Sequence, residues 1–174
     1  TTNDLIVDMD QSFSEPVGIT YNTKLNEVYV TYDNNPSLHI VDFDTPQPEI
    51  TEVPIPSYGN DAVALDQTND KLYIASWAHA EIEVIDLKER KFEKNIKDLG
   101  IIPHMFTITY NPRNRCIYFP LGASAVNGTF GASLTKVNVD TREVSKIKTA
   151  WAPIDLIEIP ERNSFLVFNN QDQF

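Results

Sequence analysis

The sequence predicts an all-β fold built from a repeated unit of four antiparallel strands. The first observation is a short apolar run that recurs about every 45 residues, at Val28–Val30, Leu72–Ile74, Ile117–Phe119 and Phe165–Val167. The second is that polar segments rich in Asn, Asp and Pro, suited to tight turns, precede each run. The third is that 11 prolines and many β-branched residues interrupt any helical period.

The first two strands of each unit form a hairpin. The first strands are predicted at Gly18–Tyr21, Ala62–Leu65, Thr107–Tyr110 and Asp155–Glu158. The recurring apolar runs form the second strands. They are almost wholly apolar, which is typical of a strand that is covered on both faces.

Two further strands complete the unit. The third strands are predicted at Leu38–Asp42, Ile82–Asp86 and Thr135–Asp140, and each ends in an aspartate before a polar turn. The fourth strands are predicted over 49–55, 91–97 and 143–148, and the last two alternate and carry charge, as an exposed edge strand should. Residues 85–100 are the strongest helical candidate, but they follow a third-strand pattern and are predicted as a turn plus a strand.

A period in the mid-forties with four strands per repeat is typical of the blades of a β-propeller. We therefore predict one propeller domain with about four blades in this chain. Residues 1–14 are expected to hold the last strand of a preceding blade, at Leu5–Met9. Residues 15–58 and 59–102 form two blades, 103–150 form a blade with an inserted loop at 122–133, and 151–174 form the first half of a further blade.

The segments YVTYDN at Tyr29–Asn34, IVDFDT and VIDLKERKFEKNI resemble the YVTN/NHL group of β-propeller repeats. They are also similar to the SMP-30/gluconolactonase-like propellers. This resemblance implies a complete ring of six or seven blades. We therefore expect the chain to be part of a larger propeller, whose ring is closed by a partner chain, a missing segment or an oligomer.

The composition is acidic, with a formal net charge of −11 and a sequence pI of about 4.6. This balance argues against nucleic acid and against anionic membranes as partners, because both require clustered Lys and Arg. It is compatible with cationic ligands and metal ions. The single Cys116 lies in an apolar run and is expected to be a buried, inert thiol. The compartment is not determined, although the sequon Asn127-Gly128-Thr129 slightly favours secretion.

Residues just before the first strands should surround the mouth of the central channel. Alignment of the repeats brings Glu15, Asn60, Asp61, His104 and Asp155 around one opening. Carboxylate and amide oxygens with an imidazole suit a divalent cation such as Ca²⁺ or Mg²⁺.

The segments SEPVGI and GNDAVALD look like those that supply metal ligands in SMP-30-like lactonases. By that resemblance, Glu15 and Asn60 would be metal ligands. His104 and Asp155 are the candidate catalytic residues for proton transfer. The alternative is that Glu15 and Asn60 cap loops and that His104 is packed inside its loop.

The candidates for ligand binding at the mouth are Asp61 and three further residues, Trp77, His79 and Trp151. The two indoles could stack on a flat ligand, or they could pack between blades. Three functions therefore remain open. The first is a propeller that binds a small molecule, the second is a metal-dependent lactonase or lyase, and the third is a protein-interaction scaffold.

Overall fold

The computed structural model describes residues 15–99, 107–120, 133–149 and 153–169. The first sheet contains β1 (Pro16–Asn22), β2 (Glu27–Tyr32), β3 (Ser37–Asp42) and β4 (Glu49–Pro54). The second contains β5 (Asn60–Asp66), β6 (Lys71–Ser76), β7 (Glu81–Asp86) and β8 (Lys91–Ile96). The third contains β9 (Thr109–Asn111), β10 (Cys116–Pro120), β11 (Ser133–Asn138) and β12 (Val144–Lys148). The fourth contains β13 (Pro153–Ile159) and β14 (Ser164–Asn169), joined by the 3₁₀ turn η2 (Pro160–Arg162).

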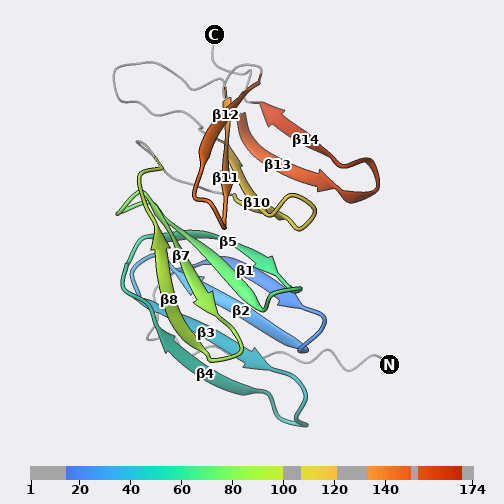
Figure 1. Ribbon diagram of the computed structural model, residues 1–174. Helices are drawn as coiled ribbons and strands as arrows, with labels where there is room; N and C mark the ends of the chain where they lie inside the picture. Colours follow the sequence, from blue (N-terminus) through green and yellow to red (C-terminus); the bar gives the residue numbers. More distant parts are fainter. Residues whose placement is uncertain (1–14, 100–106, 121–132, 150–152, 170–174) are drawn as a thin grey trace.

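Every sheet is antiparallel, and its strands are neighbours in chain order. We call the first three sheets the first, second and third blades, and they follow one another through the molecule (Figure 1). The predicted repeat is therefore confirmed, and residues 85–100 contain the end of β7, a turn and β8 rather than a helix. Within the described ranges, no helix is long and apolar enough to cross a membrane.

Several strand boundaries differ from the prediction by one or two residues; β1, β5 and β13, for example, each begin two residues earlier than predicted. β9 begins at Thr109 rather than at Thr107. β11 ends at Asn138 because the Asn138 side-chain oxygen accepts hydrogen bonds from the backbone amides of Asp140 and Thr141, both at 2.9 Å, and so starts the turn early. The predicted strand at 5–9 and the insertion up to residue 132 lie outside the described residues, and Ser133 begins β11.

The turn between the first and second strand of each blade has a local cause. The side-chain oxygen of the last residue of β1, Asn22, accepts from the amides of Lys24 and Leu25 at 3.0 and 3.3 Å. Asp66 and Asn111 do the same at the ends of β5 and β9. The residue before each second strand has a positive φ of about 50°, at Asn26, Asp70, Arg115 and Asn163.

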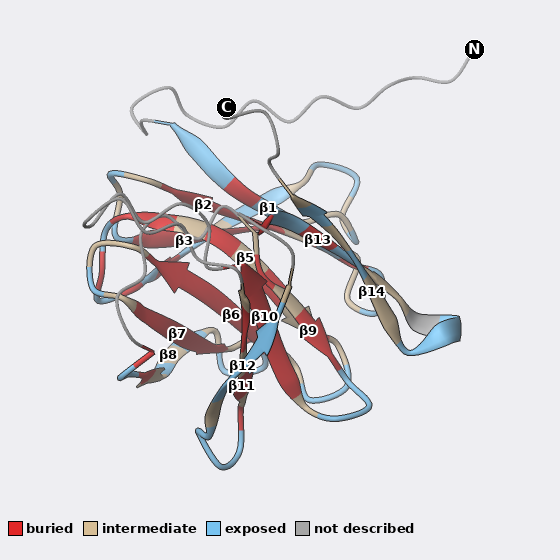
Figure 2. Ribbon diagram, turned by 90° about the horizontal axis from the view of Figure 1, so that it is seen from above, coloured by how far each residue is buried: buried red, intermediate tan, exposed pale blue. Residues whose placement is uncertain are grey.

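The hydrophobic core lies between the sheets rather than inside one of them. One cluster joins Tyr29, Leu38 and Ile40 of the first blade to Leu72, Ile74 and Ile85 of the second. A second cluster joins Ile82 and Val84 of the second blade to Ile117 and Phe119 of the third. A third joins the third blade to β13 and β14 through Tyr118, Leu156 and Phe165. The second strands β2, β6 and β10 are accordingly buried on both faces, as predicted (Figure 2), whereas β14 of the fourth sheet is partly exposed.

Candidate ligand-binding channel

The inner strands β1 and β5 and the segment before β9 enclose a hollow of about 210 Å³. Residues from all three segments line it, among them Val17, Ile19, Asp61, Val63, Thr107 and Ile108. The hollow occupies the place where the sequence predicts the central channel. Several of the lining side chains are apolar, but most of the surface exposed inside the hollow is polar, and Asp61 provides a carboxylate.

A glycine allows β1 to approach β5 closely. A Cβ added to Gly18 would collide with Thr31 Oγ1 and would lie 3.1 Å from Val63 Cγ1. Thr31 is fully buried, so it has little room to move. The absence of a side chain at Gly18 therefore sets the spacing of the inner strands at the hollow.

A β-bulge places Asp61 in the hollow. The register of β5 against β6 shifts between Asn60 and Ala62, and Asp61 is the extra residue. The same shift leaves Val17 as the extra residue of β1 and Ile154 as that of β13. A bulge redirects the side chain of the extra residue, so this repeated irregularity turns one residue per blade away from regular pairing. In the second blade that residue is acidic and half-buried.

The loops at this end of the molecule are joined by a short hydrogen-bond chain. The amide of Asp33 donates to the carbonyl of Glu15 at 3.2 Å, and the amide of Gly59 donates to the carbonyl of Asp33 at 2.6 Å. The amide of Trp77 then donates to the carbonyl of Gly59 at 2.9 Å. The Trp77 indole also donates to Asp33 Oδ1 at 3.0 Å. These bonds fix the loops of the first and second blades to each other.

The backbone conformation of Gly59 and its lack of a side chain leave room for the Trp77 indole. Its φ is +74°, a conformation that favours glycine. A Cβ at this position would lie 2.8 Å from Trp77 Nε1 and 2.9 Å from Ala78 Cβ. Trp77 is therefore a half-buried residue held by Gly59 and Asp33, with part of its surface left at the mouth.

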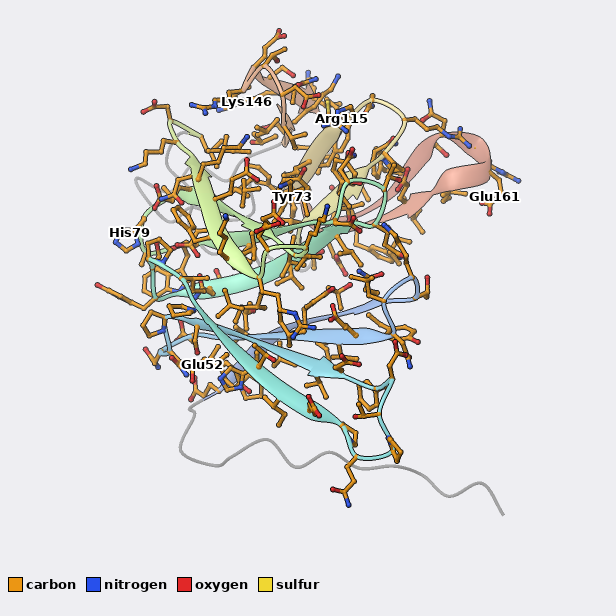
Figure 3. All side chains as sticks on the ribbon, turned by 60° about the horizontal axis from the view of Figure 1, so that its bottom comes forward. Glu52, Tyr73, His79, Arg115, Lys146 and Glu161 are labelled. Carbon is orange, nitrogen blue, oxygen red and sulfur yellow. The ribbon has the colours of Figure 1, made fainter. Side chains whose placement is uncertain are left out.

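An exposed aromatic pair stands beside Trp77. The rings of Tyr58 and His79 meet edge to face, with centroids 5.6 Å apart and an interplanar angle of 76°. Tyr58 has a large hydrophobic side chain, and yet it is 56% exposed. Figure 3 shows His79 at the outer edge of the molecule. Sequence analysis missed Tyr58 and Asp33; Asp33 occupies the same repeat position as Trp77, and that equivalence could have identified it.

The remaining predicted site residues have different environments. Glu15 is exposed and has a φ of 50°. Asn60 is fully buried, and its Nδ2 donates to the carbonyl of Ser57 at 3.2 Å. Asp155 is exposed and accepts a hydrogen bond from the amide of Leu156 at 2.8 Å. His104 and Trp151 lie outside the described residues. Within the ranges that the structure describes, no three His, Cys, Asp or Glu side chains form a group that could hold a metal ion.

Two glutamates that sequence analysis did not single out are buried between the first and second blades. Glu81 is 6% exposed and Glu83 is fully buried. The pKa of Glu83 is raised from 4.5 to about 7, chiefly by burial; Ser57 lowers it, and the charge of the neighbouring Glu81 contributes to the rise. The Ser57 hydroxyl lies beside both carboxylates, but its hydrogen bond in this geometry goes to Glu81, at 3.4 Å.

A second hollow, of about 260 Å³, lies between the second and third blades, near Tyr73 and Arg115 (Figure 3). Its charged groups are already paired with one another. Lys71 Nζ lies 2.6 Å from Glu93, and Arg115 Nη2 donates to Asp140 at 2.7 Å. Because these charges compensate each other, the hollow offers no unmatched group to a ligand.

No model of a protein family matches the sequence, and no curated protein matches it. The fold is similar to that of hydrazine synthase from Kuenenia stuttgartiensis, with a TM-score of 0.75 and 16% identity over 99% of this chain and 46% of that one. It is also similar to a structure of a nidogen/laminin complex, with a TM-score of 0.69 and 14% identity over 88% of this chain and 56% of the other. Apo AztD from Citrobacter koseri has a TM-score of 0.57 and 11% identity, over 79% of this chain and 36% of its own.

These proteins have propeller-type folds, and at such low identity the likeness concerns the fold alone. Together with the three antiparallel four-stranded sheets and the two-stranded fourth sheet, it defines the class of this protein. The chain is a β-propeller of about four blades. It spans about half the length, or less, of the similar chains named above.

Proposed function

We propose that this propeller binds a small organic molecule at the mouth of its central channel. The observation that carries the proposal is the position of Asp61, a half-buried carboxylate that a β-bulge directs into a hollow between the inner strands. In ligand sites, which are typically concave, a few placed polar groups fix the orientation of the ligand.

The chemistry of the lining suggests the class of ligand. The mostly polar surface inside the hollow favours a compact polar molecule, and the Asp61 carboxylate favours an amine or a hydroxyl group on it. The net charge of −11 would raise the local concentration of cations. The exposed faces of Tyr58 and His79 could stack on a ring that extends beyond the hollow.

The test is a ligand-observed NMR screen with amines, polyols and carboxylic acids of similar size. We expect binding by amines and polyols, and a loss of roughly tenfold or more in affinity in the Asp61→Asn variant, because one charge-assisted hydrogen bond contributes about 1.5–3 kcal/mol. Asp44→Asn is the matched control, since Asp44 is exposed in the turn after β3, near Asn26 and away from the hollow. Equal binding by the wild type and the Asp61→Asn variant would contradict the proposal.

The finer resemblance to YVTN/NHL and SMP-30-like propellers remains part of this proposal, supported by the repeat itself. The metal-dependent lactonase or lyase is the alternative function. It would require Glu15, Asn60 and His104 to converge, and only the first two are described. A protein-interaction scaffold is the second alternative, and the exposed Tyr58–His79 pair is the observation that favours it.

We also propose that further blades cover the two ends of the stack. On β1 of the first blade, Ile19 is 74% exposed and Tyr21 is 49% exposed. On the fourth sheet, Ile157 and Leu166 lie opposite each other and are 54% and 51% exposed. Either a further segment of chain or a second copy would bury these faces. Native mass spectrometry should find a dimer or a partner chain, and a stable 19.7 kDa monomer would contradict both forms of assembly for this chain.

A further inference from the structure

The contact between the first and second blades contains a buried polar cluster, which we call the inter-blade cluster. Its members are Ser57, Asn60, Glu81, Glu83 and Asn95. Glu81, Glu83 and Ile85 occupy every second position of β7, so their three side chains share one face of the strand. Ile85 packs in the core between the first two blades, and both carboxylates therefore face the first blade.

Glu81 has partial compensation for its charge. Its Oε1 accepts a hydrogen bond from Asn95 Nδ2 at 2.7 Å and from Ser57 Oγ at 3.4 Å. Its Oε2 lies 3.6 Å from Lys97 Nζ, but the Lys97 side chain is 67% exposed. An ion pair of that length with an exposed, mobile partner contributes little.

Glu83 has less compensation, since only Ser57 lies close enough to favour its charged form, and burial outweighs that effect. The residue is fully buried, and neither of its carboxylate oxygens accepts a hydrogen bond within the geometric limits. Asn95 lies directly opposite Glu83 on β8, but its Nδ2 donates to Glu81 and its Oδ1 is a further buried acceptor without a donor. A carboxylate in this state loses its hydration and gains little in return.

Asn60 adds another unsatisfied oxygen. It lies on β5 opposite Ser76, which in turn lies opposite Glu81 on β7, so the three residues form one row across the second blade. The Asn60 Nδ2 is held by the carbonyl of Ser57, and this orients Oδ1 as an acceptor. Oδ1 is buried and accepts no hydrogen bond. Ser57 thus contacts both Asn60 and Glu81 and connects the row to the loop after β4.

We propose that the inter-blade cluster is a Ca²⁺ site in which Glu81, Glu83 and the side-chain oxygen of Asn60 are ligands. Every unsatisfied atom in the cluster is an oxygen acceptor, and hard cations bind oxygen. Because no third acidic, imidazole or thiol group completes the set within the described ranges, the other ligands are neutral oxygens. Ca²⁺ accepts amide oxygens and waters in irregular geometry, whereas Mg²⁺ requires a nearly ideal octahedron.

This site is separate from the channel hollow and does not depend on the proposed ligand function. Asn60 and Asp61 are neighbours in sequence, but Asn60 is buried in the cluster and Asp61 lines the hollow. A cation in the cluster would join β5 and β7 of the second blade where that blade contacts the first. Its principal effect is therefore on stability.

The test uses the complete 174-residue chain after treatment with a chelator and exchange into metal-free buffer. CaCl₂ is then titrated in by isothermal calorimetry, and the unfolding temperature is measured with and without it. We expect one Ca²⁺ per chain, a higher unfolding temperature, and a weaker response to MgCl₂. The Glu83→Gln variant should lose roughly tenfold or more in Ca²⁺ affinity. Glu89→Gln, which removes the same charge from an exposed turn of the same blade, should behave as the wild type.

A second variant, for which we expect a higher Ca²⁺ affinity, tests the proposal if Glu83→Gln does not fold. Asn60→Asp adds a charge to a proposed ligand and should bind Ca²⁺ more tightly than the wild type. No Ca²⁺ binding to the wild type would overturn the proposal, as would equal affinities in the wild type and either cluster variant. An equal response to MgCl₂ would indicate general charge screening rather than a calcium site, and it would likewise overturn the proposal.

Discussion

The buried Glu83 makes a specific prediction about stability and pH in the calcium-free protein. Its pKa is raised from 4.5 to about 7, with desolvation as the largest cause. The folded state therefore keeps a proton that the unfolded state releases. Stability is greatest below pH 4.5 as far as this group is concerned, falls as pH rises towards 7, and then levels off. The shift corresponds to about 3 kcal/mol, at about 1.36 kcal/mol per pH unit.

The assay is urea unfolding at pH 5, 6, 7 and 8 in the presence of a chelator, for the wild type and Glu83→Gln. We expect the wild type to lose about 2.5 kcal/mol relative to the variant between pH 5 and 8, because the rest of the effect has already developed by pH 5. The comparison matters because the lowered pKa values of Asp86 and Glu93, which accept hydrogen bonds from Lys71, act in the opposite direction in both proteins. Parallel profiles for the two proteins would refute the argument that Glu83 is desolvated.

Two further predictions concern the packing between the first and second blades. Gly59→Ala should lower the free energy of unfolding by roughly 1–3 kcal/mol, because it combines a φ of +74° with a Cβ 2.8 Å from Trp77 Nε1. Thermal unfolding and indole fluorescence measure this, and unchanged values for both would contradict it. Ile74→Ala should cost about 2–5 kcal/mol in urea unfolding, since Ile74 is fully buried in the core that joins the two blades. A loss below about 1 kcal/mol would mean that this contact is not a packed core.

Much of the strand order could be predicted because it depends on short-range effects. The period of the apolar runs identifies the second strands, and the polar turns between strands are stabilised by residues two or three positions away, such as Asn22 with Lys24. Asn138 shows the limit of this reasoning. The aspartate at 140 looked like the end of a strand, but an asparagine two residues earlier had already started the turn.

The candidate site could be predicted only in part. The repeat alignment predicts that Asp61 and Trp77 lie at the same end of the blades, because equivalent positions in successive blades occupy equivalent places. It did not reveal that Asp33 holds the Trp77 indole, a contact that spans 44 residues of sequence. Such a contact depends on the distance between two blades. Gly18 and Gly59 set that distance, because a side chain at either position would collide with neighbouring residues.

The sequence by itself determined the architecture: repeated antiparallel hairpins, buried second strands and exposed fourth strands. These follow from local turn chemistry and from an alternation of period two, which act within one blade. Only the tertiary structure decided the environment of Glu81 and Glu83. In isolation, EIEVID is an alternating strand whose glutamates would face water. The first blade covers that face, so side chains that look like a solvated surface in the sequence become buried carboxylates between two sheets.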